Sequence, residues 1–342
     1  MNKKELKLAE VAENLVSWAK SGYKMLIISH RSPDGDTLGS AFALKLMYEA
    51  MGGSATCTCQ SEAAPFLRFL YSGQEEIEYT EGFENGFDKI ISVDVASLST
   101  LGELSHLAEK IDMMIDHHEM GERFADFLVD GKRSAAGEIV FDIYEYLIDK
   151  GYINTIPEAA KRMYAAISSD SGSFKFSNTN ERTHIIAGRL VSEMSAAGIE
   201  HAEVGRILHD SFTYDDLRAR KLAIDNLKVI CDGKLAYVMI TNKVLEESGL
   251  CEDNTGSIVD IPRSLEGVLV AIAIKQKGEN EFRIQSRSNS AIDVAAICSQ
   301  LGGGGHRKAA GARYIADSAE EAEKAITELF AKAVQEYSEE NN

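Results

Sequence analysis

Residues 24–36 read KMLIISHRSPDGD, and this stretch decides the class of the fold. Its apolar and β-branched start, KMLIIS, predicts a short buried strand. Pro-Asp-Gly then indicates a turn, and the following TLGSAFALKLMYEAMGG predicts a helix that ends at two glycines. Strand, loop and helix in this order form the repeating unit of an α/β fold.

The alternation of strands and helices continues beyond this first unit. Further strands are predicted at SATCTC (residues 54–59), at FDKIISVDVAS (residues 87–97, ending near Asp94) and at IDMMIDHH (residues 111–118, ending near Asp116). Strands that alternate with helices predict a parallel sheet covered on both faces. Ligands bind such sheets at the carboxyl ends of the strands, so the residues that follow each strand are the first candidates for a site.

The rest of the chain predicts a second α/β domain. Residues 134–208 have helical periodicity, and the charged stretch HDSFTYDDLRARK after them indicates a linker or a connecting helix. Beyond it, strands are predicted at residues 234–241, 267–277 and 281–288, and helices at residues 293–303 and 319–337. We therefore predict an N-terminal parallel-sheet domain over residues 1–200, a linker over 201–220, and a smaller C-terminal α/β domain over 221–342, across a cleft.

Composition excludes several classes of protein. Apolar residues make up 44% of the chain and charged residues 26%, which is typical of a globular protein and not of a disordered one. No apolar run approaches the roughly 20 residues of a membrane helix, and the charged N-terminus is unlike a signal peptide. The five cysteines are scattered and include no CxxC pair, which argues against a disulfide framework and a thiolate zinc site. These features predict a cytoplasmic protein with no membrane partner.

The net charge of −18 is distributed unevenly along the chain. A strongly acidic chain is a poor partner for long duplex nucleic acid, whose phosphates attract basic surfaces. Residues 261–314, however, hold eight Lys or Arg residues against four Asp or Glu residues, a local net charge of +4. This pattern favours a small polyanionic ligand that is held at one place.

Four segments place carboxylates or imidazoles where strands are predicted to end: His30-x-x-x-Asp34-x-Asp36, Asp94, Asp116-His117-His118, and Asp170 in SSDSGSF. Each segment alone has an ordinary structural explanation, such as a turn, a helix cap or a helix C-terminus. Together they would bring five carboxylates to one edge of a sheet, where repulsion raises their pKa values unless a cation neutralises them. Without thiolates, oxygen and imidazole ligands favour Mn²⁺, while Mg²⁺, zinc and iron stay open. Two such ions about 3.5–4 Å apart are a known solution for in-line attack on phosphorus.

The segment GGGGH at residues 302–306 is a second candidate site. Glycines let the backbone approach a ligand closely and turn N–H groups toward an anion. Arg307 and Lys308 follow directly, and Arg287 lies in the preceding predicted strand. The alternative is that this loop only ends the helix before it.

Several of these segments also carry a family resemblance. HRSPDGDTLGS, VDVAS, DHH and DSGSF resemble, in order, the four motifs of the DHH phosphoesterase superfamily, and SRS…DVAAICSQLGGGGHRKAAGA resembles the DHHA1 domain. Within the superfamily the chain is most similar to the bacterial nanoRNases that also dephosphorylate nucleoside 3′,5′-bisphosphates. Two departures from the family pattern are small: Ser171 stands where Thr is common, and Arg31-Ser32 replaces a spacer that commonly contains Asn.

The resemblance implies a role for each motif residue. One Mn²⁺ would be held by His30, Asp34 and Asp94, and the other by Asp36, Asp94, His117 and Asp170, with Asp94 as the bridge. His118 would face the scissile phosphate, as a phosphate ligand or as proton donor to the leaving oxygen, and Asp116 would orient a histidine by a hydrogen bond. In the DHHA1 domain, the nucleotide end that is not cleaved would be bound by Arg287, Ser288, Gly303, Gly304, Gly305 and His306.

The function that follows is a Mn²⁺-dependent hydrolase of very short RNA or DNA oligonucleotides and of 3′,5′-bisphosphate nucleotides such as pAp, which becomes AMP. Cyclic dinucleotides or their linear products are alternative substrates, because they offer the same phosphodiester. A family II pyrophosphatase lacks the GGGGH segment, and a processive RecJ-like exonuclease is disfavoured by the short, acidic chain. A non-catalytic nucleotide sensor is the alternative from another class, and both a monomer and a homodimer are compatible with the sequence.

Overall fold

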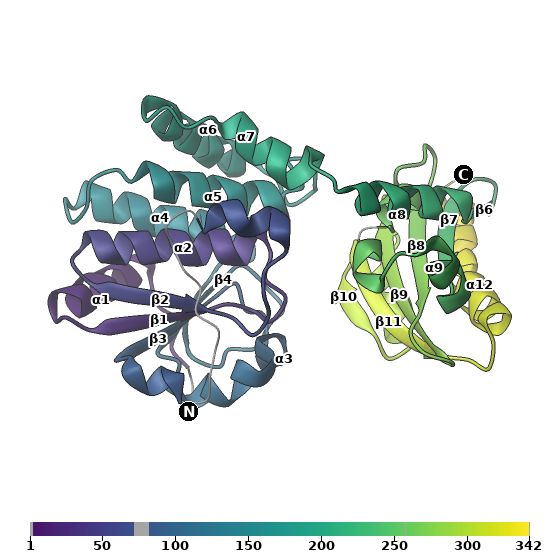
Figure 1. Cartoon of the computed structure of the whole chain (residues 1–342), viewed down its shortest axis with the longest axis horizontal. Helices are drawn as coiled ribbons and strands as arrows, with labels where there is room; N and C mark the ends of the chain where they lie inside the picture. The colour runs from purple at the N-terminus through teal and green to yellow at the C-terminus, as the bar shows by residue number, and fades with distance from the viewer. Residues whose placement is uncertain (1–2, 72–81, 257, 342) are drawn as a thin grey trace. The chain divides into compact units, whose positions relative to one another are not determined.

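The computed structural model describes residues 3–71, 82–256 and 258–341. The chain divides into two compact units, Met1–Ser211 and Phe212–Asn342, each with its own sheet and its own hydrophobic core (Figure 1). The predicted α/β class with a parallel N-terminal sheet is confirmed. The division between the units falls inside residues 201–220, the stretch that the sequence suggested as a linker.

The first unit is built on a five-stranded sheet in which every neighbouring pair of strands is parallel. The order across the sheet is β2-β1-β3-β4-β5. The strands are β1 (Lys24–Ile28), β2 (Ser54–Thr58), β3 (Lys89–Val93), β4 (Met113–Asp116) and β5 (Asp126–Val129). The first four are the strands that the sequence predicted, whereas β5 was not predicted.

Both faces of this sheet are buried, which explains the continuous apolar run of β1. Met25 and Ile27 point into the core under the long helices, and Leu26 and Ile28 point into a second core on the opposite face. The long helices are α1 (Leu8–Lys20), α2 (Gly35–Ala50), α4 (Ala136–Asp149) and α5 (Pro157–Asp170). The opposite face is covered by the shorter segments α3 (Leu98–Leu101), η2 (Phe83–Gly86) and η3 (Gly102–Lys110).

Helices α2 and α5 lie side by side at very close range (Figure 1). A side chain at Gly39 would place its Cβ 2.5 Å from the carbonyl oxygen of Arg162, and one at Gly35 would place it 2.6 Å from the side chain of Ser169. Only glycine allows this approach without moving a backbone. The contact brings the C-terminal end of α5 beside the start of α2. Outside this layer lie η1 (Pro65–Leu70), α6 (Glu181–Ala196), α7 (His201–Gly205) and η4 (Arg206–Asp210).

The second unit holds a six-stranded mixed sheet in the order β10-β11-β9-β8-β7-β6. Only β7 and β8 run parallel, and all other neighbouring pairs are antiparallel. The strands are β6 (Leu227–Ile230), β7 (Leu235–Ile240), β8 (Val270–Gln276), β9 (Glu281–Ser288), β10 (Gly304–His306) and β11 (Ala309–Ile315).

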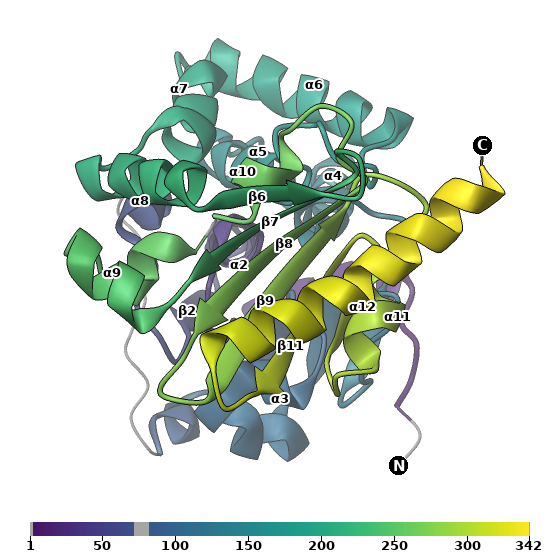
Figure 2. The ribbon, with the colours of Figure 1, turned by 90° about the vertical axis from the view of Figure 1, so that its right-hand side faces the viewer.

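Helices cover both faces of this second sheet. Figure 2 shows α12 (Ala319–Glu340) lying across one face, where it shares a core with α11 (Val294–Ser299). The other face packs against α8 (Tyr214–Asp225) and α10 (Asp260–Arg263). The short α9 (Asn242–Ser248) and η5 (Glu252–Thr255) complete the unit.

Two expectations from the sequence need correction. The glycine-rich segment was expected to be a loop, but Gly304–His306 forms the edge strand β10 and pairs with β11. Asp170 was grouped with residues at strand ends, but the alternative of a helix C-terminus is the correct one, because Asp170 is the last residue of helix α5. Across the residues that the structure describes, none of the helices has the length and apolar character needed to span a membrane.

Candidate metal centre

The cluster of carboxylates and imidazoles lies where the strand order of the first sheet reverses. The chain leaves β1 toward β2 on one side and returns as β3 on the other side, so the carboxyl ends of β1 and β3 border a crevice. His30 follows β1, and Asp94 is the first residue after β3. Asp34 and Asp36 lie at the start of α2, the helix that follows β1.

Asp34 caps helix α2 and also faces the candidate site. Its Oδ1 accepts hydrogen bonds from the amides of Asp36 and Thr37, both at 3.0 Å, and thereby caps α2. Its Oδ2 lies on the other side of the carboxylate, 3.7 Å from Nε2 of His30. One oxygen therefore caps the helix while the other faces the site.

Asp94 lies at the centre of the cluster. It is 3% exposed and has a left-handed backbone with φ of 58°, and its amide donates to the carbonyl of Ile115 at 2.9 Å. Its Oδ2 lies 3.6 Å from Nε2 of His30, and its Oδ1 lies 3.6 Å from Nε2 of His117. The two oxygens of Asp94 thus face two different histidines.

Three overlapping sets of side chains could each hold an ion. Within each set, one ligand atom per residue lies within 4.8 Å of the others. The sets are His30, Asp34 and Asp94; Asp36, His117 and Asp170; and Asp94, His117 and His118. All six residues predicted as metal ligands from the sequence are in these sets, and Asp94 and His117 each belong to two of them.

Backbone groups hold the second set in place. Asp36 accepts hydrogen bonds from the amides of Ala136 at 2.7 Å and Gly137 at 2.9 Å, at the start of α4, and from the hydroxyl of Ser40 at 2.9 Å. Nε2 of His117 lies 3.2 Å from Oδ2 of Asp170 and 3.8 Å from Oδ2 of Asp36. Asp170 reaches the cluster because α5 packs against α2.

The two histidines of the DHH segment are oriented by different partners. Nδ1 of His117 lies 3.3 Å from the carbonyl oxygen of Arg133, which leaves Nε2 toward the carboxylates. Nδ1 of His118 lies 2.7 Å from Oδ1 of Asp116, a carboxylate with no exposed surface. Asp116 is therefore placed to orient His118, as the sequence suggested for one of the two histidines.

The carboxylates of the cluster attract positive charge, as the raised pKa values of three of its residues indicate. Burial lowers the pKa of His30, but Asp34 and Asp94 outweigh it and raise the pKa to about 10. Burial likewise opposes a charge on His117, yet Asp170, Asp36 and Asp94 raise its pKa to about 11. Burial, followed by the charges of Asp94 and Asp170, raises the pKa of Asp36 well above its usual range. Without a cation, protons bind to these groups and offset the negative charge. A bound cation would neutralise the carboxylates instead.

Two buried atoms provide an independent sign that the site fits a metal. Oδ1 of Asp94 and Nε2 of His117 are inaccessible to solvent and make no hydrogen bond of good geometry, although Nε2 of His117 lies 3.2 Å from Oδ2 of Asp170. Buried polar atoms are normally paired, because an unpaired one costs about 1–3 kcal/mol. Both atoms point into the cluster, where a hard cation would be their partner. Carboxylate oxygens and imidazole nitrogens suit Mn²⁺, Mg²⁺, zinc or iron.

A pocket of about 330 Å³ opens over this cluster. Sequence reasoning assigned no function to four of the residues that line it, namely Arg31, Ser32, Ala96 and Thr100. Arg31 and Ser32 lie inside the motif that begins at His30, so their position along the chain was a signal that they border the site. The other lining residues are His30, Asp34, Asp94, His118 and Asp170.

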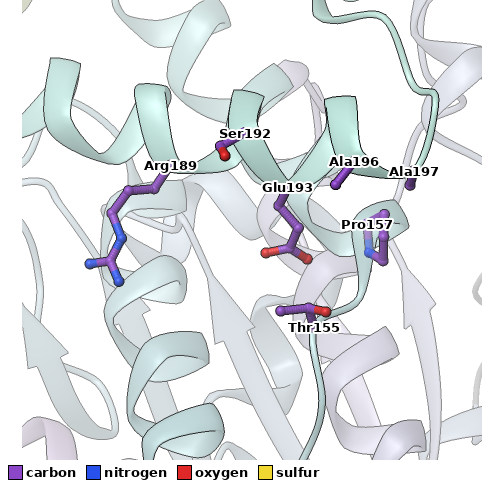
Figure 3. Close-up of a pocket in the computed structure, with 7 residues that line it drawn as sticks. All are labelled: Thr155, Pro157, Arg189, Ser192, Glu193, Ala196 and Ala197. Carbon is purple, nitrogen blue, oxygen red and sulfur yellow. The ribbon is translucent and has the colours of Figure 1, made fainter.

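A separate hollow of about 500 Å³ lies beside α6, away from the cluster (Figure 3). Its lining includes one carboxylate, Glu193, and one cation, Arg189, but no histidine. Of these two hollows, the pocket at the sheet edge is the one lined by residues that could hold a metal ion.

The structure brings together some of the predicted substrate-binding residues of the second unit and separates others. His306 pairs with Ala309, and Ala309 pairs with Arg287, so His306 and Arg287 share one face of three adjacent strands. Ser288 is the next residue after Arg287 and faces the opposite side, where it is 5% exposed and its hydroxyl donates to the carbonyl of Ser290 at 3.1 Å. Its side chain is not on the face that carries Arg287.

The three glycines of this segment differ in what requires them. A Cβ at Gly303 would lie 2.2 Å from the carbonyl oxygen of Gly311, and a Cβ at Gly305 would lie 2.6 Å from that of Ala309. Gly305 also has a φ of 144°. Both glycines are therefore required by the close pairing of β10 with β11. Nothing lies within 4 Å of a Cβ at Gly304, so that position is open.

A parallel sheet with an acid-and-imidazole cluster at its switch point, followed by a mixed-sheet unit, is the architecture of a two-domain phosphoesterase. Residues 24–167 match the DHH family, N-terminal domain, and residues 232–332 match the DHHA1 domain. The chain belongs to the DHH phosphoesterase superfamily and is of the DHH–DHHA1 type.

Individual relatives extend this comparison. The probable bifunctional oligoribonuclease and PAP phosphatase NrnA of Streptococcus mutans is 28% identical over 84% of this chain and 88% of its own length. The cyclic-di-AMP phosphodiesterase PdeA of Listeria monocytogenes is 25% identical over 89% of this chain, which spans only 46% of that protein. The crystal structure of an exopolyphosphatase-related protein from Bacteroides fragilis superposes with a TM-score of 0.82 at 23% identity, over 95% of this chain and 96% of that one. That likeness establishes the shared fold.

Proposed function

We propose that this protein is a Mn²⁺-dependent phosphodiesterase that hydrolyses very short oligonucleotides to mononucleotides and removes phosphate from nucleoside 3′,5′-bisphosphates. The observation that carries the proposal is Asp94, whose two carboxylate oxygens face two separate sets of potential ligands. The similarity to the NrnA protein of Streptococcus mutans over nearly its whole length supports the choice of substrates.

Two ions fit the ligand sets. His30, Asp34 and Asp94 would hold one ion. Asp36, His117 and Asp170 would hold the other, with Asp94 as the bridge, since its Oδ1 lies 3.6 Å from Nε2 of His117. Ions bound there would offset the charge on the phosphate and lower the pKa of the attacking water. Water attacks phosphorus in line, the bond from phosphorus to the leaving nucleoside oxygen breaks, and a proton must reach that oxygen.

His118 is the residue placed to manage that proton. It lines the pocket, and the hydrogen bond between its Nδ1 and Asp116 fixes which ring nitrogen faces the substrate side. Burial lowers the pKa of His118, but the hydrogen bond and charge of Asp116, with the charge of Asp94, outweigh burial and raise the pKa, so the ring holds a proton that it can donate. Arg287, Gly304 and His306 would bind the nucleotide end that is not cleaved, and Gly303 and Gly305 would allow the close pairing of β10 with β11 beside them. Ser288 faces the opposite side of the sheet and would take no direct part.

The test is hydrolysis of RNA from two to twenty-four nucleotides, adenosine 3′,5′-bisphosphate and cyclic di-AMP, each with Mn²⁺. We expect rapid loss of the shortest RNAs and of the bisphosphate. His118→Ala should abolish both activities, whereas His106→Ala, an exposed histidine outside the pocket, should keep them.

Each other result has a clear meaning. Equal cleavage at every length would contradict a preference for short RNA. Cleavage of cyclic di-AMP in preference to all others would favour the activity named for the Listeria relative. No hydrolysis of any substrate, with nucleotide binding retained, would favour a sensor.

A further inference from the structure

Arg31 borders the candidate metal centre but has no role in holding it. It directly follows His30 and lines the 330 Å³ pocket together with Ser32 and Thr100. Its amide donates to the carbonyl oxygen of Thr100 at 2.7 Å, which ties its backbone to the segment after β3. The side chain is exposed, so its guanidinium is available to a ligand.

The fold leaves room for the Arg31 side chain at one specific place. A Cβ at Gly102 would lie 3.2 Å from Cδ of Arg31 and 1.7 Å from Oε1 of Gln60. Gly102 also has a φ of 61°, which disfavours other residues. Gln60 is itself held in place, because its Oε1 accepts a hydrogen bond from the amide of Glu103 at 3.0 Å. The aliphatic part of the Arg31 side chain therefore passes over Gly102, next to the fixed side chain of Gln60.

The charge of Arg31 is not compensated by the protein. Its guanidinium makes no hydrogen bond or ion pair with any residue that the structure describes. It is the one Lys or Arg among the residues that line this pocket. Two divalent ions would neutralise the four carboxylates of Asp34, Asp36, Asp94 and Asp170, so Arg31 would supply the positive charge that remains for a second anion.

We propose that Arg31 binds a phosphate of the substrate that is not hydrolysed, and thereby selects short nucleotides with a terminal phosphate. This inference rests on the proposed function and names its substrate class more closely. A guanidinium offers paired N–H donors that match two phosphate oxygens, a geometry that lysine cannot reproduce. The scissile phosphate would lie over the ligand cluster, and Arg31 lines the same pocket with its side chain beside Gly102.

The experiment compares dinucleotides that carry a 5′-terminal phosphate, a 3′-terminal phosphate or neither, with bis(p-nitrophenyl) phosphate as a diester that has no second phosphate. The proteins are the wild type, Arg31→Ala, Arg31→Lys and the control Arg68→Ala, an exposed arginine that pairs with Glu62. We expect the wild type to prefer one phosphorylated dinucleotide. Arg31→Ala should reduce this preference about 10- to 100-fold, mainly through KM, because a hydrogen bond to a charged group is lost.

The remaining outcomes separate this inference from the proposed function. An equal loss of kcat/KM on all substrates, or an unchanged preference, would overturn the role of Arg31. If the wild type cleaves only bis(p-nitrophenyl) phosphate, the proposed function fails. In that case the test is equilibrium binding of adenosine 3′,5′-bisphosphate to the His118→Ala protein, with and without Arg31→Ala. Equal affinities would refute phosphate binding by Arg31. Binding that is about 10-fold weaker without Arg31 would support it.

Discussion

Nδ1 of His118 lies 2.7 Å from Oδ1 of Asp116, and Asp116 is fully buried. The same oxygen accepts the amide of His117 at 2.9 Å. Asp116 therefore fixes both the ring of one histidine and the backbone of the next residue along the motif. A buried carboxylate holds its histidine partner in one tautomer. Asp116 therefore determines which ring nitrogen of His118 carries the proton in the pocket.

Asp116→Asn should lower kcat by about 10- to 100-fold, because an amide of the same shape cannot hold the His118 tautomer as a carboxylate does. The measurement is kcat on adenosine 3′,5′-bisphosphate, with Mn²⁺ affinity from calorimetric titration. We expect the affinity for Mn²⁺ to change less than kcat. A parallel loss of both would mean that Asp116 is itself a metal ligand.

Asp94→Asn should abolish binding of both ions, because Asp94 belongs to two of the three ligand sets and its two oxygens face His30 and His117. Asparagine tolerates the left-handed backbone at this position, so the variant should still fold. Asp34→Asn is the matched comparison and should lose one ion, since Asp34 belongs to one set. Elemental analysis of the purified proteins after Mn²⁺ loading measures the stoichiometry. One ion retained by Asp94→Asn would refute the bridge.

Mn²⁺ should raise the melting temperature of the wild-type protein, because it binds the folded cluster and relieves carboxylate repulsion. At a free concentration 100 times the Kd, a ligand of this kind stabilises the fold by about 2.7 kcal/mol. Differential scanning fluorimetry with and without EDTA measures the shift. The shift should be much smaller in Asp36→Asn, and an equal shift in both proteins would place the ion elsewhere.

Asn178→Ala should weaken Mn²⁺ binding although Asn178 does not reach the cluster. Its amide group donates to the carbonyls of Ser134 and Asp170, both at 3.0 Å, and so ties the end of α5 to the segment before α4. Loss of the two bonds should cost about 1–3 kcal/mol of stability.

Asn180→Ala is the control for Asn178→Ala. Asn180 caps α6 by accepting the amides of Arg182 and Thr183, so its loss should cost about 0.5–2 kcal/mol. Urea unfolding should show similar destabilisation of the two variants, whereas calorimetry should show weaker Mn²⁺ binding for Asn178→Ala alone. Weakened binding in both would mean that stability, and not position, determines affinity.

Lys275→Met should change how stability depends on pH. Burial, with a smaller contribution from Arg283, lowers the pKa of Lys275 to about 8 from its usual 10.5. Between these values the unfolded chain binds more protons, so Lys275 destabilises the fold fully below pH 8 and less as pH rises toward 10.5. The free energy of unfolding of Lys275→Met minus that of wild type should therefore fall across this range. The exposed Lys243→Met should show no such trend.

The motifs around the candidate site could be predicted because their geometry is local. The run before His30 marks β1, and Asp34 and Asp36 must then lie at the start of the next helix, since a turn of fixed length separates them. Asp94 and Asp116 follow recognisable apolar strands in the same way. Parallel strands bring such ends to one edge, so the sequence alone predicts most of the cluster.

Features that depend on contacts between distant segments were missed or misplaced. Short strands such as β5 and β10 carry little apolar periodicity, and pairing with β4 and β11 stabilises them. Ser288 was misplaced for a different reason: successive residues of a strand point to opposite faces, so the strand predicted over residues 281–288 already separates Ser288 from Arg287. Arg31 was seen as a departure from a family pattern, and its lack of a partner became visible only from its surroundings.

Local patterns along the chain are enough to predict the α/β class, the order of the two units and most of the residues that cluster at the sheet edge. The folded structure was needed to see that amides at the start of α4 hold Asp36, and that Asn178 ties the end of α5 to the segment before α4. Periodicity and turn chemistry act within a few residues, whereas backbone donors and close helix contacts have no residue pattern of their own. They exist only once Gly35 and Gly39 let α2 pack against α5.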